Sequence, residues 1–471
     1  MQGRASSEPR VALLDHYSGS NLGDAAIIDA TITQIRARLP RVRLSGVSLN
    51  NENMQVRHGI PGIALCATPL PYYKMSGRSS PQDGVTGSRS NEAPGPVRAA
   101  MLVVKDVVKR SAPRLWRACR SVHFVMTSIP GEIRHVAQAY AHLRSCDLLV
   151  IAGGGQLDDE WGGAWGHPYA LLKWTAVSRL AGTPVAVLSV GVCKLSSFVS
   201  RLFISAALRL ACYRSFRDAH SRDLARDLVE AVRDDAIVPD LALALRPSGV
   251  DPSTPRVPGA GRSMTIAVSP IAFARADAWP SGDPSVHERY VRVMASLVSQ
   301  LLERGARLRF VYSSLGTDQM TLTEILGQLD DVARGRLEGQ STVAAIAGWQ
   351  DFVAAVSGVD CVIASRLHSA ILSYLVTRPV IAVSFDPKVN WLLEDFDCQE
   401  ALLDIHDFTA GAVLSTLDQL AAAQPGVSRR LAEAVSRAYA MHALQFDRLV
   451  ALTNRSNRAR ALPAVSAPAK G

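Results

Sequence analysis

Short apolar segments alternate with amphipathic segments along most of this 471-residue chain, and this alternation constrains the fold more than any other feature. Residues 148–152, 184–192 and 307–314 are apolar runs with the length of buried strands. Each is followed by a segment whose apolar residues recur at helical spacing. Strands that alternate with helices favour parallel sheets covered on both faces, so the sequence predicts an α/β fold with doubly wound parallel sheets.

The chain length and the distribution of Pro, Gly and Ser indicate two domains. A chain of 471 residues exceeds what one hydrophobic core usually supports. The alternation stops in a segment rich in Pro, Gly and Ser and then restarts. The predicted order is a Rossmann-like domain at 1–245, a linker at 246–263, a second Rossmann-like domain at 264–424, a helix at 425–452 that packs back across the first domain, and a disordered tail at 453–471.

Two segments interrupt the pattern of the first domain. Residues 60–97 are dense in Gly, Ser and Pro, which predicts a flexible surface insertion. Residues 98–120 alternate apolar and basic positions, with Asp106 as the only acid. Two interpretations of this basic segment remain open: a surface helix with solvated charges, or an amphipathic helix lying on an anionic membrane.

Composition narrows the class of partner and the compartment. The 51 Lys and Arg exceed the 42 Asp and Glu, giving a net charge of +9 that favours anionic ligands. The sequence carries no zinc-finger spacing or RNA-binding signature, so no nucleic-acid partner is predicted. The seven cysteines form no CxxC pair, which is typical of free thiols in a reducing compartment. Without a signal peptide or an apolar stretch long enough to span a membrane, the predicted location is the cytoplasm.

Polar clusters follow several predicted strands, where parallel α/β sheets bind ligands. In "NLGDAAI", Asn21 and Asp24 stand at a helix start; they either cap the helix or approach a substrate. In "GGGQLDD", the glycines Gly153, Gly154 and Gly155 allow close backbone approach to a ligand. Asp158 and Asp159 follow as a helix cap or as a base for a hydroxyl group. The loop lacks the Lys and Ser or Thr of a P-loop, so ATP hydrolysis is not predicted.

The most specific cluster is "SRLHSA", in which Arg366, His368 and Ser369 lie where a strand passes into a helix. An arginine fork, a titratable imidazole and free helix amides suit an anion, although a structural ion pair would also explain the arginine. Lys388 follows the next predicted strand. Because consecutive strands are often neighbours, one anion is expected to reach Arg366, His368 and Lys388.

From Val11 to roughly Leu403 the chain resembles the polysaccharide pyruvyl transferases. The resemblance rests on "NLGDAAI", "GGGQLDD", "SFRDAHSRDL" followed by "VPDLALAL", and "SRLHSAILSYLVTRPVIAVSFDPK", in that order. It implies a GT-B-like pair of domains facing a cleft, with the acceptor on the N-terminal side and the donor on the C-terminal side. It also implies transfer of pyruvate from phosphoenolpyruvate to a sugar of a cell-surface polysaccharide or glycolipid precursor, forming a ketal.

The resemblance assigns residues to the donor: Arg217 in "SFRD", Arg366, His368 and Lys388 match the family's basic residues. Two arginines, a lysine and helix amides can hold a carboxylate and a phosphate without a metal, and no cofactor is expected. His368 is the expected general acid. The expected base is Asp24, Asp158 or Asp159. The alternatives are a nucleotide-sugar glycosyltransferase of the same fold and a non-catalytic carbohydrate-binding protein.

Overall fold

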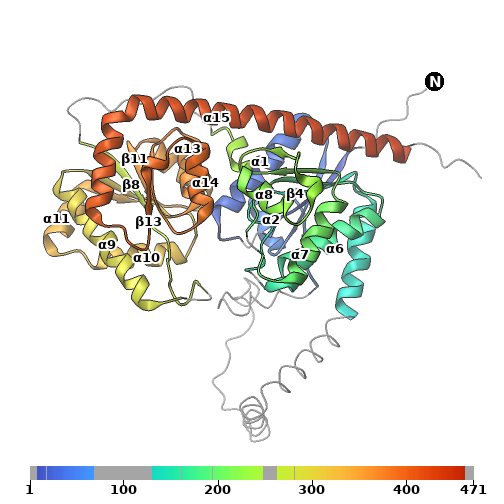
Figure 1. Ribbon diagram of the computed structural model, residues 1–471, viewed down its shortest axis with the longest axis horizontal. Helices are drawn as coiled ribbons and strands as arrows, with labels where there is room; N and C mark the ends of the chain where they lie inside the picture. The colour runs from blue at the N-terminus through green and yellow to red at the C-terminus, as the bar shows by residue number, and fades with distance from the viewer. Residues whose placement is uncertain are drawn as a thin grey trace, which may run out of the picture.

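The computed structural model describes residues 8–16, 19–67, 130–160, 162–193, 195–247, 263–279 and 282–461. These residues form two α/β domains with a long helix laid along one side of both (Figure 1). The predicted basic segment at 98–120, nearly all of the predicted linker and most of the predicted insertion lie outside the described residues.

The N-terminal domain is built on a seven-stranded parallel sheet in the order β3-β2-β1-β4-β5-β6-β7. A helix at 130–144 precedes β4. The strands are β1 Arg10–Leu14, β2 Arg43–Ser48, β3 Gly62–Ala64, β4 Leu148–Ala152, β5 Val185–Val190, β6 Tyr213–Phe216 and β7 Ala236–Ile237. The other helices are α1 Leu22–Arg38, α2 Asn51–His58, η2 Gly163–Trp165, α6 His167–Leu180, α7 Phe198–Leu210, α8 Ala219–Arg226, η3 Glu230–Val232 and η4 Leu241–Ala244.

The C-terminal domain is built on a six-stranded parallel sheet in the order β10-β9-β8-β11-β12-β13. Its strands are β8 Thr265–Ser269, β9 Arg307–Phe310, β10 Ser341–Val343, β11 Cys361–Ala364, β12 Val380–Ser384 and β13 Leu402–Asp404. Its helices are α9 Pro284–Glu303, α10 Thr317–Gly327, α11 Asp331–Gln340, α12 Trp349–Ser357, α13 Leu367–Tyr374, α14 Pro387–Asp395, η5 Gln399–Ala401 and α15 Ala410–Ala461.

The predicted α/β architecture with doubly wound parallel sheets is confirmed. In each sheet the first strand lies beside both the second and the fourth strand of its domain, so the direction of winding reverses between β1 and β4 and between β8 and β11. Ligands of such sheets bind at this reversal, beyond the carboxyl ends of the strands. β3 uses residues 62–64 of the predicted insertion and pairs with β2.

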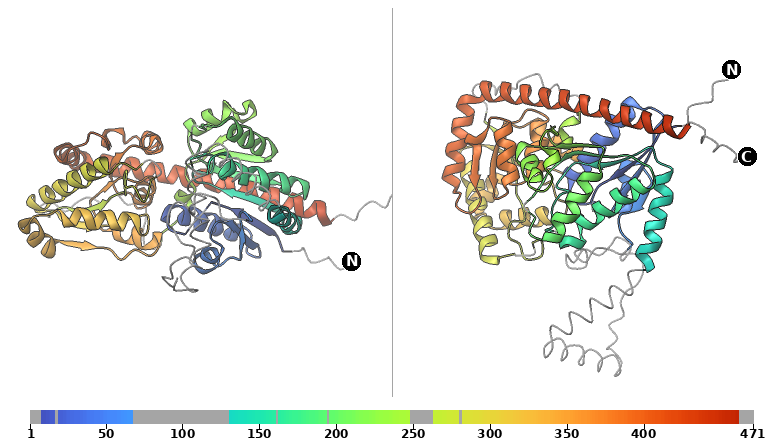
Figure 2. Two further views of the ribbon diagram at one scale, coloured as in Figure 1. Left: turned by 90° about the horizontal axis from the view of Figure 1, so that it is seen from below. Right: turned by 45° about the vertical axis from the view of Figure 1, so that its right-hand side comes forward.

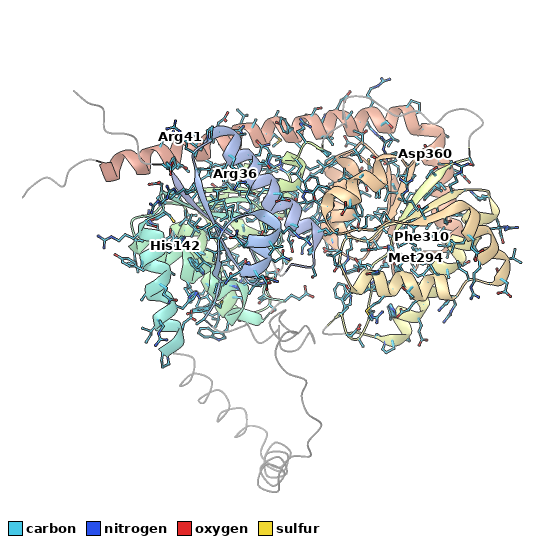
Figure 3. All side chains as sticks on the ribbon, turned by 180° about the vertical axis from the view of Figure 1, so that it is seen from behind. Arg36, Arg41, His142, Met294, Phe310 and Asp360 are labelled. Carbon is cyan, nitrogen blue, oxygen red and sulfur yellow. The ribbon has the colours of Figure 1, made fainter. Side chains whose placement is uncertain are left out.

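The hydrophobic core runs through both domains. One cluster lies between the N-terminal sheet and α6 and α7, and a second extends from α1 and η4 into the core of the C-terminal domain. In that second cluster Met294 of α9 and Phe310 of β9 are fully buried (Figure 3). Because α1 contributes to a core shared by both sheets, the two domains are packed together and not merely linked.

The backbone joins the two domains at the start of α1. The amide of Leu22 donates to the Ser313 carbonyl at 2.9 Å, and the amide of Leu315 donates to the Ser20 carbonyl at 2.9 Å. These bonds form an antiparallel bridge between the loop after β1 and the loop after β9. The bridge therefore fixes the first turn of α1 against the C-terminal domain.

Helix α15 begins within the C-terminal domain and crosses to the N-terminal domain (Figures 1 and 2). It starts before and ends after the predicted span of 425–452. The earlier start was missed because Pro425 interrupts the sequence pattern without ending the helix. On the N-terminal domain, buried His442 donates from Nε2 to the Asp240 carbonyl at 3.1 Å. Gln445 Nε2 donates to Ser189 Oγ at 3.2 Å.

The docking of α15 should weaken in acid through His442. Burial lowers the pKa of His442 from 6.5 to about 4. Below pH 6.5, His442 is therefore protonated in the unfolded chain but not in the folded chain. Its contribution to the free energy of unfolding is fully present above pH 6.5 and is lost as the pH falls towards 4. The shift corresponds to about 3 kcal/mol. Between pH 7 and pH 4, the free energy of unfolding in urea should fall by about this amount more for wild type than for His442→Gln. Glutamine keeps a side-chain donor for the Asp240 carbonyl.

The exposed His406 offers a matched control for this experiment. His406→Gln should retain the wild-type dependence of unfolding free energy on pH. If His442→Gln and wild type lose stability in parallel as the pH falls, His442 does not carry the effect.

Candidate active site

A cleft of about 540 Å³ lies between the carboxyl ends of the two sheets. The loops that follow β1, β2, β4, β5 and β6 line it from the N-terminal domain, and those that follow β8, β9, β11 and β12 line it from the C-terminal domain. Both reversals of strand order therefore face the same space, as expected for a ligand site in this kind of sheet.

His368 of α13 reaches across the cleft to the first turn of α1. A methyl group placed on Gly23 would lie only 1.9 Å from His368 Cγ, so the imidazole occupies the space that a side chain would fill. Asn21 caps this helix start, because its side chain accepts from the Gly23 amide at 2.9 Å. Because residue 23 has no Cβ and Asn21 caps the helix as predicted, the His368 imidazole can lie against the first turn of α1.

Two carboxylates lie near His368. Asp240, which is buried, has Oδ2 at 3.9 Å from His368 Nε2. Burial is the main reason that the pKa of the Asp24 carboxyl is raised; His368 opposes the rise and Asp240 adds to it. A raised carboxyl pKa is suited to proton transfer near neutral pH.

Arg217 follows β6 and is held by carboxylates on one side. Its Nε donates to Asp218 Oδ2 at 3.1 Å, and its Nη1 lies 4.0 Å from Asp240 Oδ2. Nη2 is buried with no hydrogen-bond partner among the described residues. A methyl group on Gly191 would lie 2.5 Å from Arg217 Cζ, so this glycine makes room for the guanidinium. The unpaired nitrogen is a donor ready for an anionic ligand.

Arg366 is fixed by a bidentate ion pair with Asp318 at the start of α10. Its Nε and Nη2 donate to the two carboxylate oxygens at 2.6 and 2.7 Å. Asp318 is fully buried and also accepts from the amides of Ala272 and Ser314. Arg366 thus combines the two interpretations left open by the sequence: it makes a structural ion pair, and it also lines the cleft.

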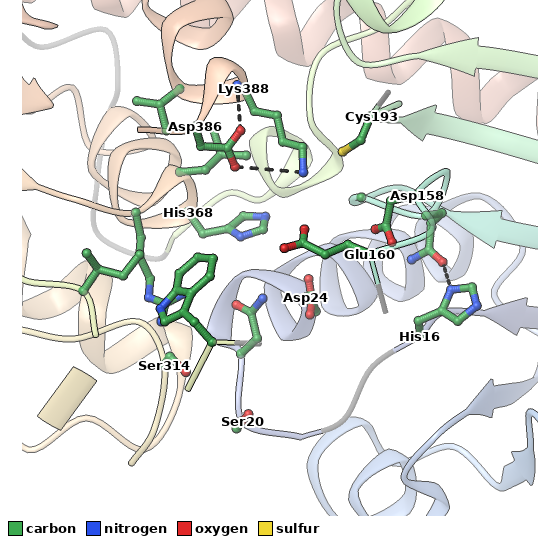
Figure 4. A pocket seen from close by; sticks show the side chains of 18 of the residues that line it. His16, Ser20, Asp24, Asp158, Glu160, Cys193, Ser314, His368, Asp386 and Lys388 are labelled. Atoms are coloured by element: carbon green, nitrogen blue, oxygen red, sulfur yellow. Dashed lines mark hydrogen bonds and ion pairs between the residues drawn. The ribbon is translucent and has the colours of Figure 1, made fainter. Parts of the chain in front are cut away.

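Lys388 extends from the start of α14 to the glycine loop after β4. Its Nζ lies 3.9 Å from Asp386 Oδ2 (Figure 4). Burial acts to lower the pKa of Lys388, but the Asp386 carboxylate and the Cys193 thiol outweigh it and the pKa is raised. A methyl group on Gly155 would lie 3.7 Å from Lys388 Nζ and 3.8 Å from Asp158 Oδ2. Residues of both domains therefore meet at Gly155.

Histidines and acids line the N-terminal side of the cleft beside Asp158. His16 and His167 are in ring contact, with centroids 3.7 Å apart, and His16 Nδ1 is hydrogen-bonded to Gln156 Oε1. His167 Nδ1 lies 3.6 Å from Asp158 Oδ1. Burial is the main reason that the pKa of His16 lies well below its usual value; the neighbouring His167 lowers it further, and the hydrogen bond to Gln156 opposes the lowering.

The structure brings most of the predicted site residues into one cleft. Seven of the predicted side chains line it, and so does one glycine of the loop: Asn21, Asp24, Gly155, Asp158, Arg217, Arg366, His368 and Lys388. β11 and β12 are parallel neighbours, which explains why "SRLHSA" and Lys388 share the cleft.

Other predicted residues lie elsewhere. Ser369 is fully buried and its hydroxyl bonds to Ser313 and Ser269. Gly153 and Gly154 have the positive φ angles expected of the loop but do not line the cleft. The Asp159 carboxylate accepts from the amides of Ser196 and Ser197, so it fixes the loop before α7, and Asp159 does not line the cleft.

Sequence reasoning missed several lining residues, including His16, Glu160 and His167. His16 lies two residues after the end of β1, so the rule of strand ends could have found it. Glu160 directly follows "GGGQLDD" in the loop after β4, so the same rule could have found it. His167 begins α6, where the sequence carries no comparable signal. Among the described residues, no group of three or more His, Cys, Asp or Glu is placed to hold a metal ion.

Known structures share the arrangement of domains. HepE of Anabaena in complex with UDP is 11% identical, with a TM-score of 0.51 over 95% of this chain and 100% of its own. An epimerase structure from Listeria monocytogenes, described as a putative UDP-N-acetylglucosamine 2-epimerase, is 8% identical, with a TM-score of 0.51 over 97% and 98% of the two chains. At such low identity these likenesses define the fold alone, which is the GT-B-like pair of Rossmann-like domains around a cleft.

The family is defined by sequence. The profile of the family described as "Polysaccharide pyruvyl transferase" matches residues 21–387, which run from the cap of α1 to the start of α14. The chain belongs to this family and is therefore a transferase that acts on polysaccharides. The matched span includes Arg217, Arg366 and His368, and Lys388 is the next residue after it.

The close approach of His368 to α1 predicts that Gly23→Ala inactivates the protein without unfolding it. The new methyl group must displace the imidazole, so phosphate release from phosphoenolpyruvate, the donor expected from the sequence, should fall at least ~100-fold. Phosphate release would be measured together with circular dichroism. Gly335→Ala, in a helix and with open space around it, is the control and should retain activity. Full activity of Gly23→Ala would contradict the assigned position of His368.

Proposed function

We propose that the protein transfers pyruvate from phosphoenolpyruvate to two hydroxyl groups of a sugar, forming a pyruvate ketal and releasing phosphate. The observation that carries this proposal is the convergence of Arg217, Arg366, His368 and Lys388 from both domains on one cleft. Phosphoenolpyruvate has a carboxylate and a phosphate, so it suits a site with several cations held at separate points.

Carboxylates hold the proposed donor site in place before the ligand arrives. Asp318 holds Arg366, Asp386 lies beside Lys388, and Asp240 lies between Arg217 and His368. Each cation is thus oriented on one side while its remaining N–H groups are left for the ligand. Such preorganisation lowers the cost of fixing side chains when phosphoenolpyruvate binds and when charge develops on the leaving phosphate.

The proposed reaction proceeds in two bond-forming steps. One sugar hydroxyl attacks C2 of the enol as His368 delivers a proton to C3, which turns the methylene into a methyl group. The second hydroxyl then attacks C2 as the C2–O bond to phosphate breaks, and its proton leaves with the phosphate. Asp24, beside His368 and with a raised pKa, is placed to accept a hydroxyl proton.

The proposed acceptor is a sugar unit of a cell-surface polysaccharide or glycolipid precursor, lipid-linked or free. None of the helices in the described ranges is both long and apolar enough to cross a membrane. Each of the six described cysteines is a free thiol, in keeping with a cytoplasmic site of reaction. The proposed membrane contact through 98–120 lies outside the described residues.

His368→Gln tests the proposed acid. Glutamine keeps a polar side chain of similar length but cannot supply a proton at neutral pH, so kcat for phosphate release with acceptor should fall at least ~100-fold. Binding of phosphoenolpyruvate, followed by thermal shift, should change far less. Undiminished turnover would exclude His368 as the acid. Mass spectrometry of surface glycan from a strain without the protein should reveal loss of a pyruvate ketal and identify the acceptor.

A ligand panel separates the proposed function from its alternatives. HepE was solved with UDP, so a nucleotide-sugar glycosyltransferase on the same fold is the second candidate. Phosphoenolpyruvate at about 100 times its Kd should raise the unfolding temperature by roughly 3–5 °C, while UDP and GDP sugars leave it unchanged. The reverse pattern would favour the glycosyltransferase. Stabilisation by sugars alone, with no phosphate release, would favour a non-catalytic carbohydrate-binding protein.

A further inference from the structure

The cleft is electrically divided. Its basic residues are Arg217, Arg366, His368 and Lys388, three of them from the C-terminal domain. The opposite side is formed by Gln156, Asp158, Glu160, His16 and His167, all from the N-terminal domain, and we call these five residues the acidic wall. Figure 4 shows the Glu160 carboxylate directed into the cleft with Asp158 beside it.

The acidic wall is one connected unit, because β1 and β4 are neighbouring parallel strands and their loops lie side by side. His16 bonds to Gln156 and is in ring contact with His167, which in turn lies beside Asp158. Burial is the main reason that the pKa of Glu160 is raised; the Asp158 carboxylate adds to the rise, and Lys388 from the other side of the cleft opposes it. The two carboxylates therefore act on the same small volume.

Several polar atoms of the acidic wall are buried and unsatisfied. Asp158 is only 5% exposed, and its Oδ1 has no hydrogen-bond partner among the described residues. The same holds for His16 Nε2; His167 Nδ1 also has no hydrogen bond, but it faces Asp158 Oδ1 at 3.6 Å. Buried polar groups in native proteins are nearly always hydrogen-bonded, so unsatisfied atoms in a cleft mark positions for a ligand.

The wall is richer in acceptors than in donors. His16 Nδ1 faces a carbonyl oxygen, which can only accept, so Nδ1 carries the proton and Nε2 is left as an acceptor. Asp158 and Glu160 accept as carboxylates. The complementary ligand is one that donates several hydrogen bonds and has no negative charge, because a like charge beside desolvated carboxylates is repelled.

We propose that the acidic wall is the acceptor subsite and that it selects an uncharged sugar diol against sugars that carry a carboxylate. This proposal rests on the proposed function, in which a sugar is the acceptor. Asp158 Oδ2 and Lys388 Nζ both lie within reach of Gly155, so the boundary between the wall and the cationic residues is a few ångströms wide. A hydroxyl held at Asp158 is therefore next to the donor.

Binding of matched sugars tests this selection. Methyl galactoside, glucoside and mannoside would each be compared with the corresponding methyl uronoside and with its methyl ester, which has the same skeleton without the charge. Affinities would come from calorimetry, with and without phosphoenolpyruvate. Wild type should bind at least one sugar type, and should prefer its uronate ester to the free uronate by ~10-fold or more.

Substitution of the wall carboxylates should remove this preference. In the double variant Asp158→Asn, Glu160→Gln the ratio of ester to uronate affinity should fall to within ~2-fold, because amides cannot repel the carboxylate. The thermal shift with phosphoenolpyruvate should be retained. Glu338→Gln, at an exposed position of α11, is the matched control and should keep the wild-type ratio.

Several outcomes would overturn the inference. These are equal affinity of wild type for ester and uronate, an unchanged ratio in the double variant, loss of phosphoenolpyruvate binding in that variant, or no binding of any neutral sugar to wild type. The proposed function fails separately, if wild type binds the sugars with the expected preference but neither binds nor turns over phosphoenolpyruvate.

Discussion

The contact between the first turn of α1 and the C-terminal domain is the constraint on which the site depends. Backbone bonds from Leu22 to Ser313 and from Leu315 to Ser20 hold the two domains together beside the cleft. Gly23, one residue later, leaves the space that the His368 ring fills. The proposed acid therefore comes from one domain while its position is set by the other, and the site is complete only when both are in contact.

Carboxylates hold the basic residues of the cleft in place. Asp240, Asp318 and Asp386 lie beside the cations, and the wall around Asp158 lies opposite them. The first group offsets the repulsion among neighbouring positive charges and fixes their geometry. In the proposed function, this division of charge corresponds to separate places for phosphoenolpyruvate and for a neutral sugar.

Local sequence patterns predicted the strands and the loops that follow them, and therefore Arg366, His368 and Lys388; Arg217 was predicted from the family resemblance. They could not predict Asp318, since its pairing with Arg366 depends on the neighbouring positions of β9 and β11 around β8. They also could not predict that two adjacent side chains point in different directions: Ser369 points into the core, while His368 lines the cleft. Side-chain direction at a loop or helix start is decided by tertiary packing, to which residue type is a poor guide.

Helix α15 runs along the outside of both domains and is hydrogen-bonded to a residue beside the cleft. It leaves the C-terminal domain, crosses to the N-terminal domain and there bonds through His442 to the backbone of Asp240. The side chain of that same aspartate lies between Arg217 and His368. Any hinge motion that opens the cleft must bend this helix or pull on Asp240, so opening of the cleft is mechanically coupled to the alignment of Arg217 and His368.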